Sequence, residues 1–136
     1  MRSRLLGQPG IALIEPTDHP NLVRRIRDSD LVLSDSGGIQ EEAATLGTPL
    51  LVLREKTERP EAIASGNARL VGTSAEMIVA ETRRLIDNPP ERASMARPGF
   101  PFGNGRAGAQ IASIVRQWLE QRPNLDQSLP SGTAYN

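Results

Sequence analysis

Residues 31–47, LVLSDSGGIQEEAATLG, pass from a short apolar run through two adjacent glycines into a helical pattern. Turn-forming residues bound the run Leu31–Leu33, which is typical of a buried strand in a parallel sheet. Ser36 is a good N-cap, and Gly37 and Gly38 place no side chain over the first N–H groups of the helix. Because unbonded N–H groups and the helix dipole both favour negative charge, we predict that this turn holds a phosphate.

The helix that follows the glycines has one apolar face and an acidic flank. At about 100° per residue, Ile39, Ala43 and Leu46 form the face that we expect to be buried. Glu42 flanks this face one turn beyond Gly38, where its carboxylate could accept hydrogen bonds from the hydroxyls of a ligand. A sugar hydroxyl beside a phosphate is typical of a nucleotide. Similar junctions recur in α/β proteins without a ligand, so the alternative is that the serine only caps, the glycines only turn and Glu42 is a solvated charge.

The composition limits the kind of partner that the chain can have. The 136 residues carry 16 Lys plus Arg and 16 Asp plus Glu, a balance that argues against a general nucleic-acid or membrane-surface footprint. Cysteine is absent and His19 is the single histidine, so we expect no metal site and no cofactor. No apolar run approaches a membrane span and no signal-peptide pattern is present, which favours one cytoplasmic domain.

Four apolar runs alternate with helical patterns, which predicts an α/β fold with a Rossmann-like parallel sheet and ligands at the carboxyl ends of its strands. The expected strands are residues 11–14, 31–33, 49–53 and 68–71. The expected helices are residues 21–28, 37–47, 74–87 and 106–121, with shorter ones beginning at Pro60 and Glu91. The faces expected to be buried are Ile78, Thr82, Leu85 and Ile86 on the third of these helices, and Ala107, Ile111, Ile114, Val115 and Trp118 on the last.

Arg59 is a second candidate for binding an anion. It lies in the charged loop after residues 49–53, so we expect it at the same edge of the sheet as the glycine turn. Its guanidinium offers a planar fork of donors that matches phosphate oxygens. The alternative is a surface arginine paired with Glu55, Glu58 or Glu61.

The segment Thr17–Leu22 follows the first expected strand and is also predicted at this edge. Its exposed backbone groups could pair with the edge of a flat base. We interpret His19 as a turn residue, because the sequence places no acid partner beside it.

Two motifs are similar to those of a known family. Residues 34–62, SDSGGIQEEAATLGTPLLVLREKTERPEA, resemble the signature of the non-hydrolysing UDP-N-acetylglucosamine 2-epimerases. Residues 101–107, PFGNGRA, resemble the loop before their last helix. The resemblance implies part of the carboxyl-terminal domain of a two-domain glycosyltransferase-B fold. It also implies interconversion of UDP-GlcNAc and UDP-ManNAc for cell-envelope polysaccharide, by elimination of UDP and its re-addition.

Carried over position by position, the resemblance implies a diphosphate site, a ribose contact, a nucleotide contact and a uracil pocket. Ser36, Gly37 and Gly38 would hold the diphosphate, and Glu42 would contact the ribose. Arg59 would contact the nucleotide, and the segment that contains Thr17 and Leu22 would line the uracil pocket. The sequence departs from the family pattern at Lys56, Asn104 and Leu22. Because Leu22 replaces an aromatic residue, a base would be contacted there through the backbone.

The resemblance places the catalytic groups outside this sequence. In the family, the amino-terminal domain supplies the carboxylates that move the C2 proton, so we expect no catalytic residue here and no epimerase activity of the isolated chain. Residues 1–122 are expected to be the UDP-binding portion of a larger enzyme, and residues 123–136 a disordered tail. The expected partners are UDP or UDP-GlcNAc, the missing amino-terminal half and further copies in a homo-oligomer. A noncatalytic nucleotide-sugar-binding or assembly module is the alternative.

Overall fold

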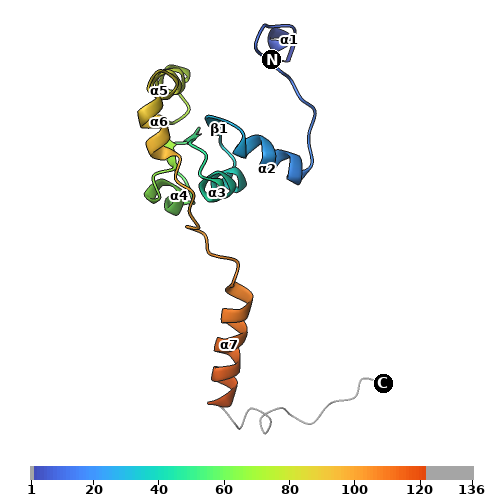
Figure 1. Cartoon of the computed structure of the whole chain (residues 1–136), viewed down its shortest axis with the longest axis vertical. Coiled ribbons are helices and arrows are strands. Elements are labelled where there is room, and N and C mark those ends of the chain that lie inside the picture. Colours follow the sequence, from blue (N-terminus) through green and yellow to red (C-terminus); the bar gives the residue numbers. More distant parts are fainter. Residues whose placement is uncertain (1, 122–136) are drawn as a thin grey trace, which may run out of the picture. The chain divides into compact units, whose positions relative to one another are not determined.

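Three parallel strands form the sheet of the computed structural model, which describes residues 2–121. The strands are β1 (Val32–Ser34), β2 (Leu50–Val52) and β3 (Ala68–Leu70), and they lie in the order β1-β2-β3 (Figure 1). The predicted α/β class with a parallel sheet is confirmed. The predicted tail at residues 123–136 lies outside the described part of the chain.

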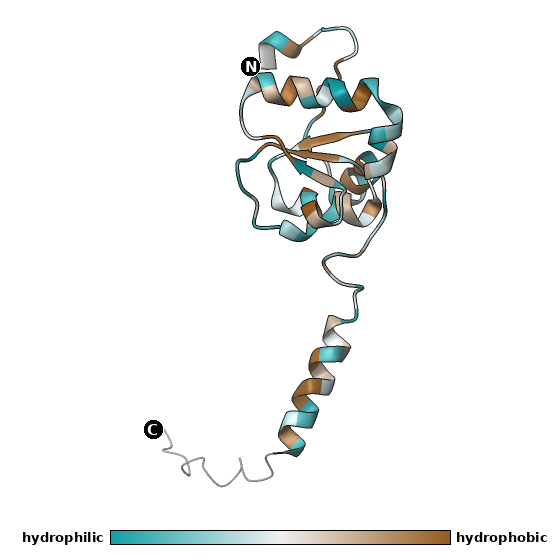
Figure 2. Ribbon diagram, turned by 90° about the vertical axis from the view of Figure 1, so that its left-hand side faces the viewer, coloured by the Kyte–Doolittle hydropathy of each residue, from teal (hydrophilic) through white to brown (hydrophobic). Residues whose placement is uncertain are grey.

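The central strand β2 carries the core. All three of its side chains are inaccessible to solvent, and side chains along a strand alternate between the two faces of the sheet. In Figure 2 the strands lie between helices and are mostly brown, the colour of hydrophobic residues. Leu50 and Val52 pack on one face against helices α2 (His19–Arg27), α3 (Gly37–Leu46) and α4 (Pro60–Ala64). Leu51 packs on the other face against α5 (Ala75–Asp87) and α6 (Pro89–Met95). The face of α3 predicted from its periodicity is the one that packs on this core.

Helix α6 begins two residues earlier than expected. The sequence predicts a helix that begins at Glu91, whereas the structure starts α6 at Pro89. Proline is compatible with a first helical turn, which has no intrahelical partner for its N–H groups. Asn88 caps the helix, because its side-chain oxygen accepts from the Glu91 N–H at 3.3 Å.

The segment after α6 returns to the core and joins it at two places. Asn67, which is buried, donates its side-chain amide to the carbonyls of Met95 and Arg97, each at 2.7 Å. Gly47 ends α3 in the left-handed region with φ +75°, and its α-carbon faces Pro98 so closely that a Cβ would lie 2.6 Å from the Pro98 nitrogen. Only glycine meets both conditions without strain.

The prediction of a strand at residues 11–14 is wrong. These residues form no strand, and Ile11, Leu13 and Ile14 are 39–52% exposed. The physical reason is that a strand needs a neighbour for its backbone hydrogen bonds, and in the described chain the only sheet neighbour of β1 is β2. The apolar run therefore stays extended without a ladder.

Two predicted buried faces are also wrong in part. Ile86 is 54% exposed, although Leu85 beside it is fully buried and Ile78 and Thr82 are half-buried. The last helix, α7 (Ala107–Glu120), belongs to a second compact unit that begins at Gly103, and none of its side chains is buried. Helical spacing predicts an apolar face but does not supply the surface that would cover it. No described helix, including the four-residue α1 (Arg2–Leu5), is long and apolar enough to cross a membrane.

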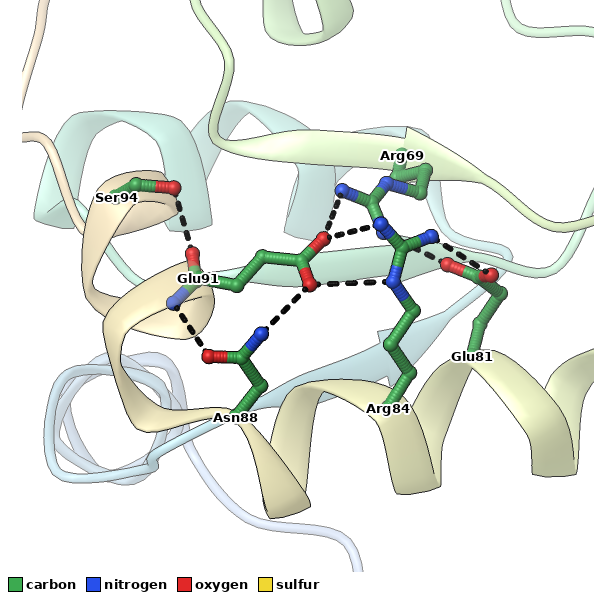
Figure 3. Close-up of polar contacts among 6 residues, drawn as sticks. All are labelled: Arg69, Glu81, Arg84, Asn88, Glu91 and Ser94. Carbon is green, nitrogen blue, oxygen red and sulfur yellow. Dashed lines mark hydrogen bonds and ion pairs between the residues drawn. The ribbon is translucent and has the colours of Figure 1, made fainter.

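A network of four charged side chains joins β3, α5 and α6 (Figure 3). Arg69 on β3 contacts Glu81 at 2.7 Å and Glu91 at 3.1 Å, and Arg84 contacts Glu91 at 2.9 Å. The hydrogen bond from Arg69 holds the pKa of Glu81 below its ordinary value, and the same bond raises the pKa of Arg69. Several charges that share partners stabilise more than isolated surface pairs do.

Replacing Glu81 with glutamine tests this network. Because the folded-state pKa of Glu81 is lowered, its stabilisation is present above the ordinary value of 4.5 and is lost as the pH falls through the lowered value. We expect the free energy of unfolding to fall by about 1 kcal/mol at neutral pH and the loss to shrink in acid. Urea unfolding over a pH series measures this, with Glu76→Gln on the same helix as the control. A loss that does not depend on pH would contradict the assignment.

The two glycines Gly47 and Gly66 separate backbone strain from crowding. Both have positive φ, but a Cβ on Gly66 would meet nothing within 4 Å. We expect Gly66→Ala to cost about 1 kcal/mol of unfolding free energy, from the left-handed conformation alone. Gly47→Ala should cost about 2 to 4 kcal/mol, because the added carbon also collides with the Pro98 backbone. Chemical denaturation of both variants measures the two losses of unfolding free energy. Equal losses would show that Pro98 can move away from the added carbon without an energetic cost.

Candidate functional site

The start of α3 leaves donors unused at the carboxyl end of β1. The first helical hydrogen bond runs from the Gln40 N–H to the Ser36 carbonyl at 3.2 Å, so the N–H groups of Gly37 and Gly38 come before it. Ser36 has extended backbone angles at the N-cap position, but its side chain makes no capping bond. The prediction of Ser36 as the N-cap residue is confirmed, but its hydroxyl makes no capping bond and has another use open to it. The turn therefore offers a ligand the N–H groups of Gly37 and Gly38 and the hydroxyl of Ser36.

Arg59 lies beside this turn. Its Nη2 is 4.0 Å from the position that a Cβ on Gly37 would take. The guanidinium forms an ion pair with Glu41 of α3, and this hydrogen bond raises the pKa of Arg59. The alternative partners predicted for Arg59, namely Glu55, Glu58 and Glu61, all lie in or beside its own loop, whereas the observed ion-pair partner lies on α3. The structure thus places a guanidinium beside Gly37, at the helix start where two backbone amides precede the first helical hydrogen bond, and both kinds of donor suit an oxyanion.

A buried hydrogen bond fixes the Arg59 loop on α3. Gln40 is fully buried, and its Oε1 accepts from the Thr57 hydroxyl at 2.6 Å. The same hydroxyl accepts from the Arg59 N–H at 3.0 Å. The Gln40 Nε2 is buried and has no hydrogen-bond partner among the described residues. Sequence reasoning missed Gln40 and Thr57, although Gln40 stands three residues before Ala43 on the inward side of the helix.

Glu42 is held by a histidine from the neighbouring helix. His19 Nε2 lies 2.8 Å from Glu42 Oε1, and Glu42 Oε2 is buried without a partner in the described chain. His19 is the first residue of α2, which Asp18 caps by accepting from the Asn21 N–H at 3.0 Å. The interpretation of His19 as a residue without an acid partner is wrong, because 23 positions of sequence separate the two side chains. Glu42 keeps one acceptor oxygen unused.

The remaining candidates, Thr17 and Leu22, lie on and before α2. Leu22 is half-buried against the core, and its N–H donates to the Asp18 carbonyl at 3.0 Å within the helix. That amide is therefore not available to a base. Thr17 lies in the exposed segment before the helix. A uracil pocket on this segment stays a prediction.

Carboxylates crowd the site, yet they do not form a metal centre. Within residues 2–121, no group of three or more His, Asp or Glu side chains is arranged to hold a metal ion. Glu58 lies on the loop that carries Arg59, and a hydrogen bond from its own backbone N–H, together with Arg54 and Arg59, lowers its pKa. The arrangement suits a phosphate on the donors and a hydroxyl group near Glu42.

Known proteins match the chain over most of its length. A family model described as UDP-N-acetylglucosamine 2-epimerase matches residues 1–116. The UDP-N-acetylglucosamine 2-epimerase of Salmonella typhimurium is 45% identical over 117 residues, which are 85% of this chain and 31% of that protein. The Escherichia coli K12 protein of the same name is 43% identical over 84% of this chain and 31% of its own length. The chain thus spans about a third of these relatives.

Solved structures of similar proteins also match most of the chain. A Neisseria meningitidis UDP-GlcNAc 2-epimerase bound to UDP-GlcNAc matches with a TM-score of 0.71 and 43% identity, over 76% of this chain and 28% of that one. The S. aureus MnaA-UDP co-structure matches with a TM-score of 0.79 and 34% identity, over 98% of this chain and 35% of that one. The similarity therefore extends from sequence to three-dimensional structure.

A matched pair of threonines tests the buried contact that holds the Arg59 loop. Thr57→Val removes the hydroxyl from Gln40 and Arg59 and leaves a buried amide without any partner, which should cost about 1 to 3 kcal/mol of unfolding free energy. Thr45→Val removes an exposed bond to the Glu41 carbonyl and should change it by less than about 0.5 kcal/mol. Urea denaturation compares the two, and a Thr57 variant as stable as the control would remove Gln40 from the explanation of the site.

Proposed function

The chain belongs to the UDP-N-acetylglucosamine 2-epimerase family, and from this premise we propose that it forms the UDP-binding part of such an enzyme. The single observation that carries the proposal is the position of the Arg59 guanidinium beside Gly37, at the start of α3, where the Gly37 and Gly38 N–H groups precede the first helical hydrogen bond. A diphosphate has oxygens enough for both kinds of donor. The UDP and UDP-GlcNAc bound in the similar structures supply the ligand class.

In this proposal Glu42 binds the ribose. Its carboxylate lies on α3 beyond the glycines, and its Oε2 has no partner in the described chain. A pair of ribose hydroxyls would give that oxygen the donor it lacks. The Ser36 hydroxyl, which makes no cap, is assigned to a phosphate oxygen, and the segment that contains Thr17 and Leu22 is assigned to the uracil.

The same donors would assist the reaction of the whole enzyme. When UDP leaves the sugar, negative charge builds up on the departing diphosphate. Helix amides and a guanidinium held in place before the reaction stabilise this charge more in the transition state than in the bound substrate. The groups that move the C2 proton are assigned to the amino-terminal half, as the resemblance implies. The proposal extends to a cytoplasmic homo-oligomer of the complete enzyme.

Calorimetric titration with UDP, uridine and inorganic diphosphate separates the assigned contacts. We expect UDP to bind, Arg59→Ala to weaken UDP and diphosphate about tenfold or more, and Glu42→Ala to weaken UDP and uridine about tenfold. Glu42→Ala should leave inorganic diphosphate unaffected, because that ligand has no ribose.

The matched controls are Arg83→Ala and Glu76→Ala, which change the same charges on α5, outside the proposed site. If UDP bound neither the wild-type chain nor the two control variants, the proposed function would be refuted. Loss of uridine and diphosphate affinity together in the Glu42 variant would refute the division of roles.

A further inference from the structure

A carboxylate of the chain itself lies against the start of α3. A Cβ placed on Gly37 would be only 3.0 Å from Glu58 Oε1, so this oxygen lies beside the first residue of the helix. The Glu58 side chain is 52% exposed and is therefore anchored by few contacts. A negative group at a helix amino terminus is stabilised by the same field that a phosphate would use.

The cations around the turn are likewise engaged by glutamates. Arg54 forms an ion pair with Glu58 Oε2, and Arg59 forms one with Glu41. The first pair lies within the loop after β2, and the second joins that loop to α3. The positive groups that a phosphate would bind are thus already neutralised within the chain.

We propose that Glu58 is an internal competitor for the phosphate site, which masks the start of α3 until a ligand phosphate displaces it. The inference rests on the proposed function, because it concerns the same diphosphate site. On binding, the Glu58 carboxylate leaves Gly37 and the Arg54 guanidinium exchanges this carboxylate for a phosphate oxygen. The exchange replaces one exposed ion pair with another, and exposed pairs are weak enough to break.

The exchange also gives the site a preference for multiply charged ligands. A singly charged anion carries no more charge than the carboxylate that it must displace, so it gains little. A diphosphate carries more charge than the carboxylate and can engage the amides and a guanidinium together. Masking therefore lowers the affinity for every anion and rejects monoanions most strongly.

The test compares Glu58→Gln with Glu61→Gln in the complete chain. Both variants remove one negative charge near Arg59, but Glu61 lies in the first turn of α4 and has no contact with Gly37. We expect Glu58→Gln to bind UDP about three- to tenfold more tightly than wild type, since one repulsive charge beside the site is removed. Glu61→Gln should change the affinity less than about twofold, because its charge acts through solvent. Uridine, which has no phosphate, should bind all three proteins equally.

Amide NMR provides a second readout without ligand. The Gly37 signal should move in Glu58→Gln and stay in place in Glu61→Gln, and thermal melts confirm that both variants fold. Unchanged or weaker UDP binding by Glu58→Gln, or equal gains in both variants, would overturn the competitor while leaving a UDP site in wild type intact. Absence of binding by every protein would refute the competitor and the proposed function together.

Discussion

The backbone hydrogen bonds on both sides of β2 are the constraint on which the rest of the structure depends. Val32 donates to the Pro49 carbonyl at 2.9 Å on one side, and Leu50 donates to the Asn67 carbonyl at 2.9 Å on the other. This pairing aligns the carboxyl ends of the strands, so the turn after β1 and the loop after β2 emerge at one edge. Without this strand pairing, nothing would bring the glycine turn and the Arg59 loop to the same edge of the sheet.

A few further hydrogen bonds hold the Arg59 loop against α3. One hydroxyl, that of Thr57, bonds both to a buried amide on α3 and to the backbone of the loop. The loop is thus held by neutral bonds that are partly buried, and by more exposed ion pairs that water weakens. This division suits a binding site, because the backbone can stay in place while the charged side chains change partners. The Glu41 and Glu58 contacts belong to these more exposed ion pairs.

How much of this could be read from the sequence depends on the range of the interaction. The apolar run before Gly37 and the proline at residue 60 predicted local elements correctly, because strand, cap and first-turn preferences act over a few residues. The run at residues 11–14 has the same local pattern but forms no strand, since pairing requires a partner that periodicity cannot supply. The Gln40–Thr57 and His19–Glu42 contacts were missed for the same reason: each joins residues far apart in the chain. Sequence placed the candidate residues at one edge, and only the fold gave them partners.

The side chain of Asn67 bears on when the folded unit can form during synthesis. Its amide binds carbonyls 28 and 30 residues further along the chain, and the Gly99 N–H reaches back to the Ala44 carbonyl at 3.3 Å. When only the three strands have been synthesised, the carbonyl groups that accept from this buried amide are still missing. The first compact unit can therefore be completed only after residue 99 has left the ribosome. Until then the three strands must stay soluble without all of their final contacts.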